Sequence, residues 1–156
     1  MTRRQITLAL LLVSTASIST VSLAEPSRAI YADKRIAINV SQAEKNQVLY
    51  EMREFLHGLH NITLAFARQD MKAVALTARP MGPLLNRMPA SLKERLPEEF
   101  TQMSIAMNEA FQNLARDADG KLDVVKTHES LAEVITYCSG CHDTYRFNVT
   151  PLKAHK

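Results

Sequence analysis

Apolar residues of this chain recur at steps of three and four over long stretches, which is the spacing of one face of an α-helix. Strand-like alternation does not extend beyond a few residues, and the 156 residues include only six prolines and four glycines. An all-β fold needs a turn about every 8–12 residues. We therefore predict an all-α domain.

Four helical stretches are expected. The first follows a capping box formed by Ser41 and Glu44 and extends to about Arg68. Its apolar face is predicted to contain Leu49, Met52, Leu56, Leu59, Thr63 and Phe66, widened by Val48, Phe55 and Ile62.

The second helix is weaker, because Pro80 and Pro83 interrupt it after a cap at Asp70. The third begins at Pro97 and ends near Gly120. The fourth begins near residue 122, runs out before residue 151, and is predicted to place on one face His128, Leu131, Ile135, Cys138, His142 and Tyr145. Short links favour antiparallel neighbours, which predicts an antiparallel four-helix bundle with up-down-up-down order.

Residues 1–24 have the form of a secretory signal peptide. Arg3 and Arg4 precede an apolar stretch, and Ser22 and Ala24 place small residues before a cleavage site after Ala24. A membrane anchor is the alternative, but the apolar run is short and interrupted by serine and threonine. The expected organisation is a signal peptide at 1–24, an extended lead-in at 25–40 and the helical domain at 41–156. In a Gram-negative host, the mature protein would lie in the periplasm and would not span the membrane.

The formal net charge of +3 falls close to neutral once Arg3 and Arg4 leave with the signal. This balance excludes the basic surface expected of a nucleic-acid-binding protein. The sequence also lacks a Ser-His-Asp set and a phosphate-binding glycine loop, so we do not expect an enzyme.

Both cysteines of the chain lie in one CxxCH motif, from Cys138 to His142. This motif is typical of covalent haem attachment, with the cysteines forming thioethers and the histidine binding iron as the proximal ligand. A thioredoxin-like redox pair is the main alternative, but it requires a βαβ context. A structural zinc site needs four ligands, and a disulfide between residues three apart is strained. We predict one haem c, attached through Cys138 and Cys141.

The nine residues from Cys138 to Arg146 read CSGCHDTYR. A CxxCH on the last helix of a four-helix bundle, followed by Tyr-Arg, resembles the cytochrome c-prime family of class II c-type cytochromes. The resemblance extends from about Ser41 to Phe147, although only the C-terminal motif is sharp. It implies that Arg146 lies beside the proximal histidine, one helical turn away. The alternative for Arg146 is a solvated charge at a helix C-terminus.

The same resemblance places Met52 on the distal side of the haem. Some relatives bind iron through methionine there, whereas others have an apolar residue and leave iron five-coordinate. Met52 could instead be an ordinary core methionine, as we expect for Met103 and Met107. The haem environment is predicted to include Leu49, Phe55, Leu56, Tyr145 and Arg146.

Other residues are weaker candidates for the distal ligand. His57 and His60 lie one to two turns beyond Met52 on the same helix and are interpreted as surface or rim histidines, whereas His128 is too far from His142 along its helix to serve the same iron. Met81 and Met88 could cover a haem edge. Val48 stands where many members of the family have an arginine near a propionate, which leaves Lys45 as the nearest basic residue.

Two functions follow from these expectations. The first is periplasmic electron transfer by a low-spin haem with His142 and Met52 as axial ligands and a redox protein of unknown identity as partner. The second is a five-coordinate cytochrome c-prime that binds nitric oxide or carbon monoxide. A thiol–disulfide oxidoreductase is a remote third possibility. The resemblance also makes a homodimer through the first helix plausible.

Overall fold

A computed structural model describes residues 32–120 and 123–150. The predicted signal peptide at 1–24, with its cleavage site, lies outside the described residues. All the elements below belong to one compact unit that begins at Lys34. The domain therefore starts before residue 41, and the end of the predicted lead-in is an integral part of it.

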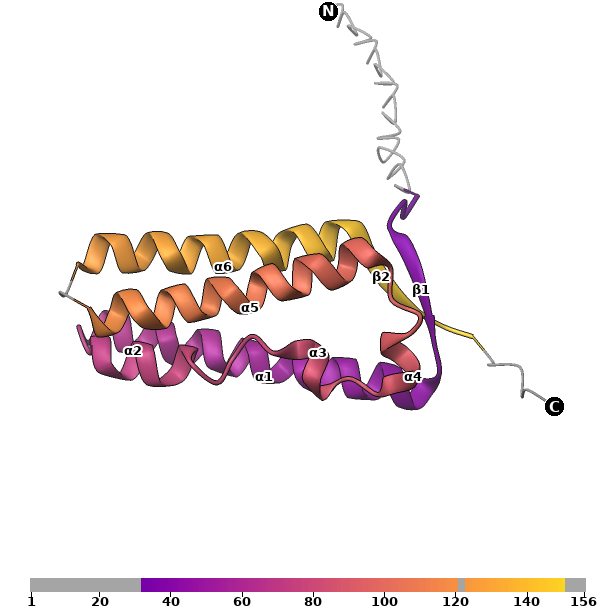
Figure 1. Ribbon diagram of the computed structural model, residues 1–156, viewed down its shortest axis with the longest axis horizontal. Helices are drawn as coiled ribbons and strands as arrows, with labels where there is room; N and C mark the ends of the chain where they lie inside the picture. Colours follow the sequence, from indigo (N-terminus) through magenta and orange to yellow (C-terminus); the bar gives the residue numbers. More distant parts are fainter. Residues whose placement is uncertain (1–31, 121–122, 151–156) are drawn as a thin grey trace, which may run out of the picture. The chain divides into compact units, whose positions relative to one another are not determined.

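The unit is predominantly helical, as predicted (Figure 1). Its helices are α1 (Gln42–Ala67), α2 (Met71–Ala78), α3 (Leu84–Arg87), α4 (Ala90–Lys93), α5 (Glu98–Asp119) and α6 (Val124–Thr144). The last helix begins after the expected position because Asp123 caps it, accepting a hydrogen bond of 3.0 Å from the Lys126 amide.

The predicted helix caps are confirmed. Ser41 Oγ accepts a hydrogen bond from the Glu44 amide at 3.2 Å, and the Glu44 carboxylate accepts one from the Ser41 amide at 2.8 Å. Asp70 caps α2 through the Ala73 amide at 2.9 Å. Beyond α2 the chain turns at Gly82, whose φ of +93° disfavours any residue with a side chain.

Two short strands were not predicted. β1 (Ile36–Val40) and β2 (Tyr145–Val149) pair in parallel, with Ile36 opposite Tyr145 and Val40 opposite Val149. The last helix ends before residue 151, as predicted, but it ends at Thr144. The placing of Tyr145 on its face is wrong, because the backbone of Tyr145 is extended. Alternating β-branched and aromatic side chains explain the strands, since such residues suit a pleated, half-buried surface.

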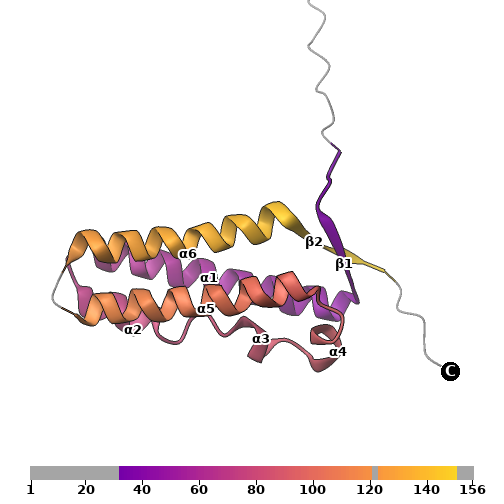
Figure 2. The same ribbon diagram turned by 45° about the horizontal axis from the view of Figure 1, so that its top comes forward.

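The long helices pack through α5, which lies against both α2 and α6, while α1 packs on α2 (Figures 1 and 2). Phe55 of α1 stacks on Phe111 of α5 with ring centroids 5.8 Å apart. At one end of the helices, Phe66 of α1 contacts the His128 ring of α6, with centroids 4.0 Å apart. The parallel strands join the opposite end, so α1 and α6 run antiparallel.

The buried face of α1 differs from the predicted one. Leu49, Leu56 and Thr63 were expected at its centre, but all three are exposed. The buried face consists instead of Glu44, Val48, Glu51, Phe55, Gly58, Ile62, Ala65 and Phe66. The face predicted on α6 is displaced in the same way: Ile135 and His128 are exposed, while Thr127, Ser130 and Val134 are buried.

Candidate cofactor site

A cavity of about 530 Å³ is bounded by the first half of α1 and the C-terminal end of α6. Its size is that of a pocket for a small molecule or cofactor. Every residue predicted from the sequence to form the site lines it: Leu49, Met52, Phe55, Leu56, Cys138, Cys141, His142, Tyr145 and Arg146. The rest of the wall consists of Arg35, Lys45, Val48, Leu59, Leu84, Met88, Phe100, Ser104, Met107 and Phe147.

The α6 wall presents two thiols and an imidazole. Cys138 and Cys141 are one turn apart, half-buried and not joined by a disulfide, and His142 follows them. Gly140 lies on the side of α6 that meets α5, where an added Cβ would be 3.0 Å from Met103 Cε. The small residue inside the motif therefore allows α6 to approach α5 closely while both thiols line the cavity.

Burial makes both thiols weak acids. Loss of solvation raises the pKa of Cys138, although a backbone hydrogen bond opposes the shift. Burial also raises the pKa of Cys141, and repulsion from Cys138 adds to it. Redox-active CxxC pairs have the opposite property, a lowered pKa that exposes a reactive thiolate. The electrostatics of this site therefore disfavour thiol–disulfide exchange.

Within 32–120 and 123–150, no cluster of three or more histidine, cysteine or acidic residues could hold a metal ion.

The α1 wall is an apolar face centred on Met52. At about 100° per residue, Lys45, Leu56 and Leu59 point within a third of a turn of its direction. Leu49 and Leu56 belong to this wall, yet they are 44% and 65% exposed. An apolar surface left open beside a cavity is typical of a ligand-binding site. The leucines that do not join the core thus form the face that an apolar cofactor would cover.

Two methionines besides Met52 also line the cavity. Met88, directly after α3, and Met107, on α5, are buried and contribute to the wall. Met107 had been expected in the core alone, so its position in the wall is an addition to the sequence prediction. Met81 and Met103 do not line this cavity, and neither do the histidines His57, His60 and His128.

Positive side chains surround the cavity without acidic ones. Arg35, Lys45 and Arg146 belong to its wall, which contains no aspartate or glutamate. Arg35 was missed in the sequence because it lies in the supposedly featureless lead-in. It donates a hydrogen bond of 3.3 Å to the backbone oxygen of His142, which fixes it beside the CxxCH motif. The wall is suited to an apolar group that carries anionic substituents.

The predicted place of Arg146 needs correction. It was expected one helical turn after His142, but α6 ends at Thr144 and Arg146 lies on β2, opposite Ala37. It nevertheless lines the cavity and is half-buried, which is not the environment of a solvated helix terminus.

Aromatic rings close the strand end of the cavity. The ring of Phe100, at the start of α5, meets the edges of Tyr145 at 5.3 Å and Phe147 at 6.0 Å between centroids. These T-shaped contacts connect α5 to β2.

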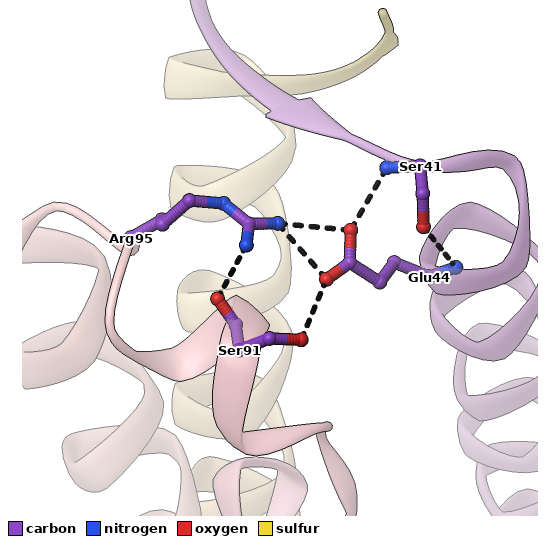
Figure 3. A network of polar contacts seen from close by, with 4 residues as sticks. All are labelled: Ser41, Glu44, Ser91 and Arg95. Carbon is purple, nitrogen blue, oxygen red and sulfur yellow. Dashed lines mark hydrogen bonds and ion pairs between the residues drawn. The ribbon is translucent and has the colours of Figure 1, made fainter. Parts of the chain in front are cut away.

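Two buried carboxylates on α1 hold the segment 79–97 that joins α2 to α5. Near the start of α1, Glu44 accepts hydrogen bonds from Arg95 at 2.9 Å and from Ser91 at 3.0 Å, in addition to its capping bond with Ser41 (Figure 3). Seven residues later, Glu51 pairs with Arg87. Sequence reasoning missed both pairs, because charged residues on an amphipathic helix are ordinarily solvated.

Comparison with family models, with curated proteins and with solved structures finds no match for this chain. Within the residues that the structure describes, none of the helices combines the length and apolarity needed to cross a membrane.

Proposed function

We propose that this protein is an exported electron carrier that holds one haem c in the cavity between α1 and α6. The observation that carries the proposal is the set of side chains that line this one cavity. Two neutral thiols and an imidazole on α6 line the same cavity as the thioether of Met52 on α1. These groups are the protein's means of attaching and ligating a c-type haem.

The described residues fit such a group. Cys138 and Cys141 would hold it through thioethers, His142 would bind iron, and Met52 would provide the sixth ligand. The open leucine face of α1 matches an apolar macrocycle, and the cationic side chains of Arg35 and Lys45 match its propionates. Lys45 thus supplies positive charge on α1 although Val48 replaces the arginine that many members of the resembling family have.

A haem held in this way supplies a one-electron ferric/ferrous couple. The chain's own residues set the conditions for it. The apolar wall would lower the polarity around the haem and a methionine thioether would favour ferrous iron, so both would raise the reduction potential. Met52 bound to the iron would also deny that position to small molecules.

The finer features of the fold belong to the same proposal. We interpret α1, α2 with α3, α5 and α6 as an antiparallel bundle related to the cytochrome c-prime family, in its low-spin branch. Export by the signal peptide at 1–24 would bring the chain to the periplasm, where a redox protein would be its partner.

The test is to produce the full chain in a host that exports proteins and attaches haem. The denatured protein is expected to retain one haem by mass. The ferric spectrum is expected to show an iron–thioether band, and the reduced protein should not change on addition of carbon monoxide. Absence of haem from the denatured chain would overturn the proposal. If the spectrum shows high-spin bands and the reduced protein readily binds carbon monoxide, the protein would be a gas-binding protein and not an electron carrier.

A further inference from the structure

The segment from residue 79 to residue 97 forms part of the cavity wall, although it contains only two single-turn helices. Leu84 of α3 and Met88, directly after α3, line the cavity, and both are buried. The backbone hydrogen bonds inside this segment are local, such as those from Met88 to Leu85 and from Leu92 to Pro89, so side-chain contacts are what fix it against α1.

Arg87, the last residue of α3, forms an ion pair with Glu51 of α1. The Glu51 side chain is only 2% exposed, and its other oxygen accepts a hydrogen bond of 3.0 Å from Gln47. Arg87 donates to Glu51 through Nε and also places its guanidinium 5.7 Å above the ring of Phe55. Two contacts, the ion pair with Glu51 and the stacking on Phe55, therefore fix the planar head of Arg87.

The members of this pair are direct neighbours of sulfur-bearing residues in the wall. Glu51 precedes Met52 on α1, and Arg87 precedes Met88. Phe55, on which Arg87 stacks, also lines the cavity. Rotation of α1 about its axis would break the pair and would move Met52 relative to α6. Displacement of α3 along α1 would also break the pair and would move Met88.

The pair is a poor means of stabilisation alone. Burying the Glu51 carboxylate costs desolvation free energy, which its pairing with the 35% exposed Arg87 side chain offsets only in part. Such a pair is better explained as a means of selecting one arrangement of α1 and α3 over the alternatives. The ion pair of Arg79 with Asp119 lies at the start of the same segment. Neither of its residues is adjacent in sequence to a methionine of the cavity wall, and both side chains are about half exposed.

From this geometry we propose that Glu51 and Arg87 are positioning residues for the sixth ligand of the haem. The pair fixes the rotation of α1 and the place of α3, and so presents Met52 to the iron while keeping Met88 in the wall. This inference rests on the proposed function. Neither residue touches the cofactor in this scheme, and both act through Met52.

The first experiment uses added imidazole as a probe of how firmly the sixth position is held. Arg87→Gln and Glu51→Gln are expected to weaken the iron–thioether band and to raise imidazole affinity about tenfold, which corresponds to about 1.4 kcal/mol of lost Met52 ligation. Arg79→Gln is the matched control and should leave both unchanged. Unchanged imidazole affinity in the Glu51 and Arg87 variants would overturn the inference.

A double variant separates positioning from stability. Glu51→Met combined with Arg87→Leu should recover thermal stability, because it removes the buried Glu51 charge together with its partner. Its imidazole affinity is nevertheless expected to stay raised. If the apolar pair restored wild-type imidazole affinity, packing alone would account for the site and the inference would fail.

A measurement on the protein without haem distinguishes this inference from the proposed function. Amide hydrogen exchange over residues 48–56 and 84–88 should accelerate in Arg87→Gln and not in Arg79→Gln. If the wild-type protein carries haem but lacks the iron–thioether band, the proposal that Met52 binds iron is wrong. The exchange result then still decides whether the ion pair fixes α1. Exchange rates equal to wild type would reject the positioning role whatever the spectrum shows.

Discussion

Met52 on α1 and His142 on α6 line one cavity, although they come from the first and last helices of the domain. The antiparallel course of the two helices creates this relationship, because it brings the start of α1 to the end of α6. A haem attached at Cys138 and Cys141 would therefore meet ligands from both helices.

The presence of three methionines in the wall makes the identity of the distal ligand testable by comparison. Met52→Leu should abolish the iron–thioether band and allow carbon monoxide to bind, because leucine has no donor atom and a similar volume. Met88→Leu and Met107→Leu should retain the band, and each should cost less than about 1.5 kcal/mol of folding free energy. Absorption spectra of the three variants, with and without carbon monoxide, provide the measurement. Loss of the band in Met88→Leu alone would assign the ligand to α3 instead.

The raised pKa of both cysteines predicts slow thiol chemistry in protein that lacks haem. Because only the thiolate reacts, each unit by which the pKa rises lowers the rate of alkylation at pH 7 about tenfold. Iodoacetamide should therefore react more slowly with the folded chain than with the chain in urea. At alkaline pH, where Cys138 ionises, Cys138→Ala should speed the reaction of Cys141, since repulsion from the Cys138 thiolate contributes to the raised pKa of Cys141. A pH profile with its midpoint below the ordinary thiol value would contradict this expectation and favour a redox-active pair.

Glu44 should make the domain sensitive to acid. Burial alone would raise the pKa of its carboxyl, but hydrogen bonds from the Ser41 amide, Arg95 and Ser91 outweigh burial and lower the pKa from 4.5 to about 2. The folded state thus binds this proton less readily than the unfolded state does. The resulting stabilisation, of order 3 kcal/mol, is complete above about pH 4.5 and disappears as the pH falls towards 2.

Urea unfolding at a series of pH values measures this contribution. Glu44→Gln should lower the free energy of unfolding at pH 7 by about 2–3 kcal/mol, because it removes charge-assisted hydrogen bonds. It should also flatten the loss of stability between pH 4.5 and 2. Glu133→Gln, at an exposed position of α6, is the matched control. A Glu44 variant with the pH dependence of the wild type would show that the carboxylate is not held as the structure indicates.

Local signals in the sequence were sufficient for much of the fold. The caps at Ser41 and Asp70, and the break at Pro80, depend on residues within one turn of each other, so their physics is contained in a short stretch of chain. The wall residues around Met52 could be predicted for a similar reason. Helical periodicity determines which side chains share a face, and the CxxCH motif indicates what that face meets.

The rotation of α1 could not be predicted in this way. A periodicity argument assigns apolar residues to the core and charged ones to solvent, and so it excluded Glu44 and Glu51 from the buried face. Those carboxylates are buried only because their partners, Arg95 and Arg87, lie 51 and 36 residues further along the chain. With both glutamates in the interior, the buried face turns away from Leu49 and Leu56, which leaves these leucines to the cavity.

The strands were missed for another reason. Each strand is five residues long, and neither is stable without its partner, which lies at the other end of the domain in sequence. Alternation in Tyr145, Phe147 and Val149 was present in the sequence, but the preceding helix was extended through it. The same error placed Arg146 on a helix and left Arg35 unnoticed.

The pairing of β1 with β2 has a consequence for the order in which the domain can be completed. During synthesis β1 appears first, and the chain that forms its partner appears only after all six helices. Joining strands so far apart closes a loop of more than a hundred residues, and the conformational entropy of that closure opposes pairing until the helices between them have packed. Tyr145 and Phe147 therefore reach the end of the cavity late. Until they do, the thiols of Cys138 and Cys141 remain accessible for attachment of the proposed haem.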